Sequence, residues 1–116
     1  MDDQLKAALD FANFRQSFLI QQKILKEKIQ SKLTYGFNGG IFKINQELIS
    51  FVQILLDKGR NTGVVLLDQN DNPVLVDDLN KFQDEIMDRY FTATNEYLEA
   101  WQKLKKSRSI EKLLDL

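Results

Sequence analysis

The chain lacks two of the most versatile residue types, since its 116 residues include neither cysteine nor histidine. Without cysteine there are no disulfides, thiolate metal sites or thiol nucleophiles, and a disulfide-stapled secreted mini-domain is disfavoured. Without histidine there are no His-based triads, no histidine general bases and no histidine zinc sites. Because histidine is the commonest acid–base group in enzymes, we predict a non-enzymatic protein that uses no cofactor.

An excess of charge and long apolar runs are missing as well. Sixteen basic residues oppose seventeen acidic ones, so no overall field attracts nucleic acid or an anionic membrane. The longest apolar runs span four residues or fewer, and the N-terminus, Met1-Asp2-Asp3-Gln4, is acidic where a signal peptide would be basic. We therefore predict a cytoplasmic protein with no membrane partner.

Glycine and proline are scarce, and neither occurs between Asp3 and Thr34. This stretch carries residues at spacings of three and four, which predict a long helix over residues 1–35: Phe11, Phe14, Phe18, Gln22, Leu25, Ile29 and Leu33. Further apolar residues widen this stripe in the first half of the helix: Leu5, Ala8, Leu9, Ala12, Leu19, Ile20 and Ile24. We expect the first half to be more buried than the lysine-rich second half.

A second long helix is predicted over residues 77–107. Its apolar face repeats every eleven residues and consists of Leu79, Phe82, Ile86, Tyr90, Ala93, Tyr97, Trp101 and Leu104. An eleven-residue repeat corresponds to about 3.67 residues per turn, which predicts nearly straight packing or a slight right-handed twist. Both long helices run from acidic to basic, so antiparallel packing brings opposite charges together.

The segment 36–76 contains the shorter elements. We interpret Gly36-Phe37-Asn38-Gly39-Gly40 as a flexible interhelical turn, followed by a short strand over 41–44. Asn45 is a predicted N-cap and Gly59 a predicted stop for a short helix over 46–58, with a strand through 48–56 as the alternative. A β-hairpin over 63–76 follows. Its strands are apolar on both faces, and because a lone hairpin is marginally stable, both faces should be covered by helices, by the strand over 41–44 or by another chain.

These elements predict a single α+β domain over residues 1–116, with two long antiparallel helices, a shorter helix and a small two- or three-stranded antiparallel sheet. The sequence predicts an amphipathic tail over residues 108–116. Helices longer than their sheet leave apolar surface uncovered, so we predict a homo-oligomer, most simply a dimer. The predicted partner surface consists of Phe11, Phe14, Phe18, Gln22, Tyr97, Trp101, Ile110, Leu113 and Leu114. Gln22 either fixes the register of this seam or lies at its edge.

Two groups of acidic and amide residues are candidate metal sites. Asp68, Asn70 and Asn72 match the first ligand positions of a calcium loop, but Pro73 replaces the required glycine and Leu79 the bidentate glutamate. Turn formation is therefore the preferred interpretation. The group formed by residues 84, 85 and 88 reads better as a solvated helix face, on which Glu85 can pair with Arg89. We predict no metal site.

A basic cluster ends the second long helix and consists of Lys103, Lys105, Lys106 and Arg108, near Tyr97 and Trp101. Basic groups contact phosphates and aromatic rings stack on bases, so this cluster is the candidate nucleic-acid contact. The competing explanation is that cations stabilise helix C-termini. A structural, assembly or protein-interaction role is thus the main functional prediction, and a nucleic-acid-binding accessory protein is the alternative.

Several stretches in the second half are distinctive: Leu-Leu-Asp-Gln-Asn-Asp-Asn-Pro-Val, then Asp78-Leu79, then Tyr90-Phe91-x-Ala93-x-Asn95-x-Tyr97, then Leu104-Lys-Lys-Ser-Arg-Ser. Together they resemble small accessory or structural proteins of T-even-type tailed phages, particularly marine ones. The resemblance covers less than half of the chain and includes no motif with a known mechanism. It implies an accessory or structural role in the host cytoplasm or the virion and assigns no functional residues.

Overall fold

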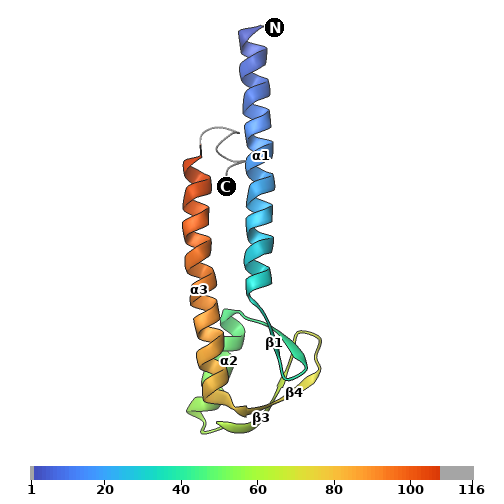
Figure 1. Ribbon diagram of the computed structural model, residues 1–116, viewed down its shortest axis with the longest axis vertical. Helices are drawn as coiled ribbons and strands as arrows, with labels where there is room; N and C mark the ends of the chain where they lie inside the picture. Colours follow the sequence, from blue (N-terminus) through green and yellow to red (C-terminus); the bar gives the residue numbers. More distant parts are fainter. Residues whose placement is uncertain (1, 108–116) are drawn as a thin grey trace. The chain divides into compact units, whose positions relative to one another are not determined.

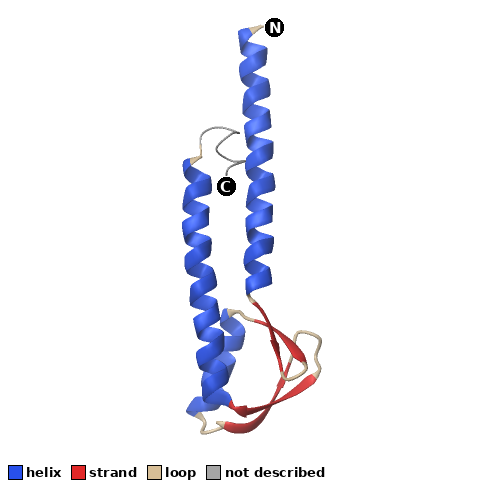
Figure 2. Ribbon diagram, viewed as in Figure 1, coloured by secondary structure: helices blue, strands red, loops and turns tan. Residues whose placement is uncertain are grey.

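A computed structural model describes residues 2–107 (Figure 1). The elements in chain order are α1 (Asp3–Lys32), β1 (Thr34–Phe37), β2 (Gly40–Lys43), α2 (Gln46–Asp57), β3 (Thr62–Leu67), β4 (Pro73–Asp78) and α3 (Leu79–Lys106). The predicted α+β class is confirmed, because three helices, of which α1 and α3 pack together, accompany small antiparallel hairpins (Figure 2).

Local capping signals place the ends of the two later helices. The Asn45 side chain accepts a hydrogen bond from the N–H of Leu48 at 2.8 Å, which confirms the predicted start of α2. At its end, Gly59 adopts a positive φ of 77° and donates to the Leu56 carbonyl at 3.0 Å. Helix α3 follows β4 with no intervening residue, and the Asp78 carboxylate accepts from the N–H of Lys81 at 3.1 Å.

The strands form two separate two-stranded sheets, β1–β2 and β3–β4. The interpretation of residues 36–40 as a flexible interhelical turn is wrong, since β1 and β2 form a hairpin around Asn38 and Gly39. Both turn residues have positive φ, 46° and 82°, which matches the preference for Asn-Gly in tight hairpin turns. Accordingly α1 ends at Lys32, earlier than predicted, because the backbone after it enters a strand.

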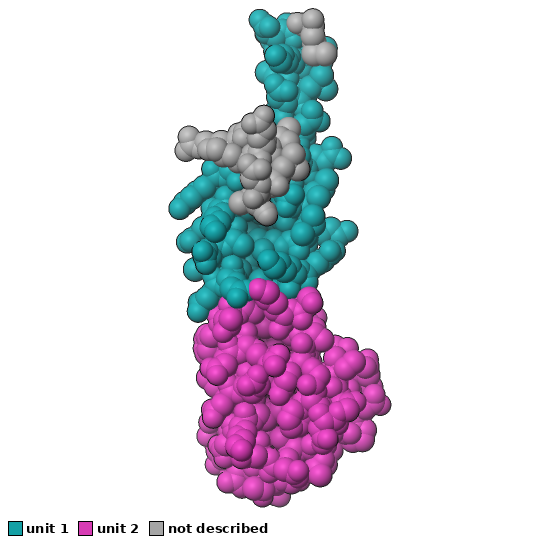
Figure 3. Space-filling model, viewed as in Figure 1, with its two compact units in different colours: residues 1–29, 95–116 teal, residues 30–94 magenta. Residues whose placement is uncertain are grey.

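The described residues fall into two compact units (Figure 3). The first contains α1 up to Ile29 together with residues 95–107. The second, Gln30–Thr94, contains both hairpins, α2 and the first part of α3.

The core of the second unit is centred on Phe82, which is 2% exposed. The rings of Phe37 and Phe42 meet its ring edge-on, each with centroids 5.2 Å apart. The largest side chains that share full burial in this unit are Phe42, Ile44, Val52, Val76, Leu79 and Ile86. Burying each stabilises the fold by about 1.5–3 kcal/mol. The buried members from α3 belong to the predicted eleven-residue stripe, which is therefore a core stripe.

A close junction joins the two hairpins. The Asp68 carboxylate accepts a hydrogen bond from the N–H of Ile41 at 3.0 Å, and the N–H of Gln69 donates to the Ile41 carbonyl at 2.9 Å. Gly40 allows this approach, because a Cβ at its position would collide with Cγ2 of the buried Val74.

Substitution of this glycine tests the junction. We expect Gly40→Ala to lower the free energy of unfolding by about 1–3 kcal/mol, since the added methyl group overpacks a buried contact. Gly36→Ala is the matched control, because its Cβ would have no neighbour closer than the Gly40 carbonyl oxygen at 4.0 Å. Urea denaturation of both variants measures the difference, and equal stabilities would contradict the close contact with Val74.

Candidate interaction surfaces

Helix α1 carries apolar side chains on two opposite sides. One side includes Phe18, Leu25 and Ile29, and the other includes Leu5, Leu9, Ile20 and Ile24. With 3.6 residues per turn, the centres of the two sets lie roughly 170° apart around the helix. A helix that is apolar all round needs neighbours on more than one side.

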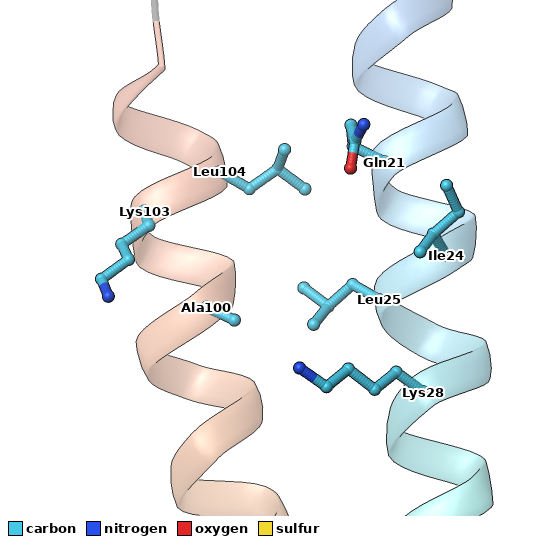
Figure 4. Close-up of a pocket in the computed structure, with 7 residues that line it drawn as sticks. All are labelled: Gln21, Ile24, Leu25, Lys28, Ala100, Lys103 and Leu104. Carbon is cyan, nitrogen blue, oxygen red and sulfur yellow. The ribbon is translucent and has the colours of Figure 1, made fainter. Parts of the chain in front are cut away.

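Helix α3 covers the first of these sides. Figure 4 shows Leu25 and Leu104 pointing toward each other between the helices, and Leu104 is only 2% exposed. A groove of about 330 Å³ runs between them, lined by Gln21, Ile24, Leu25, Lys28, Ala100, Lys103 and Leu104. The polar members of this lining are the amide of Gln21 and the ammonium groups of Lys28 and Lys103.

The other side of α1 has no cover among the described residues. Leu5, Leu9, Ile20 and Ile24 are 52%, 45%, 51% and 51% exposed. The expectation that the first half of α1 is the more buried half is wrong, because Ile29 is the buried residue of this helix. The first half of α1 is exposed because it extends beyond the last residue of α3, which therefore cannot cover it (Figure 1).

The residues of the predicted partner surface are only partly accessible. Phe11 is 66% exposed, whereas Phe14 and Phe18 are half-buried and stack with ring centroids 6.5 Å apart. Gln22 is also half-buried. On α3, the half-buried rings of Tyr97 and Trp101 meet edge-on at 6.2 Å, while Ile110, Leu113 and Leu114 lie outside the described residues.

The basic cluster at the end of α3 already interacts with its own helix. Lys103 lies 3.7 Å from the Glu99 carboxylate, and the Lys105 ammonium lies 5.7 Å from the ring centroid of Trp101. Lys106 is exposed, and Arg108 lies outside the described residues. Nucleic-acid contact by this cluster stays a prediction.

The β3–β4 hairpin is covered on one face by its own chain. Leu66, Val74 and Val76 are buried on the inner face, whereas the outer face presents Val65 and Leu75, which pair across the strands and are 59% and 47% exposed. We expected both faces to be covered, and within the described chain only the inner one is. The outer face is therefore a second apolar surface open to a partner.

An aromatic hollow in the second unit was missed because β1 was not predicted as a strand. Tyr35 and Phe37 alternate along β1 and, with Phe82, line a depression of about 590 Å³ whose rim includes Asp77, Asp78 and Glu85. The alternation of aromatic residues before the Asn-Gly turn is the signal that could have found it.

Charged groups around this hollow interact with one another and with the rings. Glu85 pairs with Arg89 at 2.7 Å, as predicted, and the guanidinium of Arg89 lies 4.3 Å from the ring centroid of Tyr35. Within residues 2–107, no three acidic side chains gather closely enough to hold a metal ion.

Asp68 has the turn role that its sequence context predicted. Besides the bond from Ile41, its carboxylate accepts hydrogen bonds from the N–H groups of Asn70 and Asn72, both at 2.9 Å. The bonds from Ile41 and Asn72 lower the pKa of Asp68, the partial burial of the group opposes them, and the bond from Asn70 adds to the lowering.

No protein-family model matches the chain, and no curated protein sequence and no solved structure matches it either. No helix between residues 2 and 107 combines the length and the apolar character needed to cross a membrane.

The lowered pKa of Asp68 makes stability depend on pH in a defined direction. Its contribution is fully present above the ordinary aspartate pKa of 3.8 and is lost as the pH falls through the lower pKa of the folded protein. Asp68→Asn should be less stable than the original chain at neutral pH, because an amide cannot accept all three bonds. Urea denaturation from pH 7 to pH 2.5 should show this gap closing at the acid end, and a constant gap would contradict the assignment.

Proposed function

We propose that the protein is a non-enzymatic assembly protein that acts by burying apolar helix and hairpin faces against other protein chains. The observation that carries this proposal is α1, which has apolar side chains on opposite sides while the described chain covers one of them. Burying a half-exposed leucine or isoleucine contributes roughly 1 kcal/mol, so a row of them can drive association.

Two further features support the same role. The outer face of the β3–β4 hairpin exposes Val65 and Leu75, and α3 exposes Phe91 and Leu98 at 54% and 56%. Scattered apolar residues on a surface are ordinary, but apolar faces on several elements are typical of chains that assemble. The resemblance to accessory and structural proteins of tailed phages points the same way, toward a component of a larger particle or of its assembly.

A second copy of the chain is the first partner to test. Light scattering over a dilution series from about 1 to 500 µM should show the mass rising from the 13.5 kDa of one chain toward that of a dimer. The midpoint should lie in the micromolar range, because a few half-exposed side chains only modestly exceed the entropic cost of association. A monomer mass at every concentration would contradict self-assembly.

A further inference from the structure

We infer that a second copy of this chain docks on the uncovered side of α1 in antiparallel orientation, about a two-fold axis that crosses the helix between residues 14 and 15. This inference rests on the proposed function and specifies the partner, the surface and the register.

The uncovered side of α1 has the same spacing and the same order of apolar and polar residues in both chain directions. Its residues, called the α1 seam below, are Leu5, Leu9, Asn13, Gln16, Ile20 and Ile24. Their spacings are four, four, three, four and four residues, with two apolar residues at each end and the two polar ones in the middle. All six are exposed. A symmetric dimer requires a patch that complements itself, and the α1 seam has this property along its length.

Antiparallel pairing about this axis places apolar side chains opposite apolar ones and polar side chains opposite polar ones. Leu5 faces Ile24 of the second copy and Leu9 faces Ile20, while the amides of Asn13 and Gln16 meet at the centre. A shift of one turn would place Asn13 opposite Ile20 or Leu9 opposite Gln16. Each mismatch buries an amide against an apolar side chain, so the polar centre fixes the register.

The period of the α1 seam suits straight helices. Leu5 and Gln16, Leu9 and Ile20, and Asn13 and Ile24 are each separated by eleven residues. This interval keeps the seam on one side of a nearly straight helix over its whole length. Helix α3 packs against the side of α1 that carries Leu25. Of the seam residues, Ile24 also lines the groove beside α3, so a second copy docked on the α1 seam would lie next to α3 at this end.

Charge decides between antiparallel and parallel pairing. The first ten residues carry Asp2, Asp3 and Asp10 against Lys6. Residues 19–32 are oppositely charged and carry Lys23, Lys26, Lys28 and Lys32 against Glu27. Antiparallel copies bring the acidic end of one α1 beside the basic part of the other, whereas parallel copies bring like charges together. Exposed pairs contribute only about 0–1 kcal/mol each, so they select the orientation while the apolar residues supply the affinity.

Because the chain has no cysteine, introduced thiols report this geometry without a background. We expect a mixture of the Leu9→Cys and Ile20→Cys proteins to form a disulfide-linked heterodimer under mild oxidation. Leu9→Cys alone should form none, since its two thiols would lie about 16 Å apart along the antiparallel helices. That distance is far beyond disulfide reach. Efficient linkage of Leu9→Cys to itself would indicate parallel pairing and overturn the inference.

Leu98→Cys provides the matched control for random collision. Leu98 is 56% exposed, a similar fraction to the seam residues, but it lies on α3. Its mixture with Leu9→Cys should not cross-link above background. Equal linkage to Leu98→Cys and to Ile20→Cys would overturn the assigned register.

A double substitution separates this inference from the broader proposal. Leu9→Gln with Ile20→Gln should weaken dimerisation at least about tenfold, since it removes one Leu9–Ile20 contact from each half of the seam. Glutamine is a good helix former and both sites are exposed, so circular dichroism should be unchanged. Val65→Thr with Leu75→Thr, on the hairpin face, should leave dimerisation unaffected.

The possible results are distinguishable. A dimer that survives the double glutamine substitution and gives no Leu9–Ile20 linkage overturns the docking on the α1 seam and leaves the proposed function standing. A monomer at every concentration overturns this inference together with self-assembly, and restricts the proposed function to partners other than a second copy.

Discussion

The carboxylate of Asp68 is the interaction on which the second unit depends. It accepts hydrogen bonds from three backbone N–H groups. Two of these belong to its own loop, and the third belongs to Ile41 in the other hairpin. A two-stranded hairpin on its own is marginally stable, and this unit contains two of them in separate sheets. The junction lets each hairpin serve as a neighbour for the other. The β1–β2 hairpin supplies the rings of Phe37 and Phe42, against which Phe82 packs.

A different constraint governs α1, because its apolar residues do not form one stripe. A helix with a single stripe is satisfied by one neighbour, and α3 fills that role through Leu104. The second row of apolar residues has no structural purpose within the described chain. This exposed apolar row is the observation on which the proposed assembly function rests.

Features set by neighbouring residues could be predicted from the sequence. The caps at Asn45 and Gly59 and the Glu85–Arg89 pair each follow from local spacing, and each is confirmed. The start of α3 was predicted two residues too early, because β4 continues through Asp78. The strand over residues 34–37 could not be separated from the helix before it, because the apolar stripe continues to Leu33. Asp68 and Ile41 are 27 residues apart in the sequence, and no local pattern predicts a contact between residues so widely separated.

The exposed side of α1 was not predicted as a surface, because its residues were expected to lie in the more buried half of the helix. Leu5, Leu9, Ile20 and Ile24 stand out in the sequence as apolar residues at helical spacing. Whether they are buried depends on how far α3 extends alongside α1, which is a property of packing between distant segments. Periodicity identifies which residues share a side of a helix, but only the folded chain shows which side is left uncovered.

The direct passage from β4 into α3 limits how this chain can change in length. Because no loop separates Asp78 from Leu79, one inserted or deleted residue would rotate all of α3 by about 100° relative to the hairpin. Leu79 donates its N–H to the Asn61 carbonyl at 3.0 Å, which ties the first residue of α3 to the chain just before β3. Substitutions around this joint can be absorbed one at a time. An insertion or deletion there would turn Phe82, Ile86 and every later residue of α3 away from its neighbours together, so the joint should keep a constant length in any functioning relative.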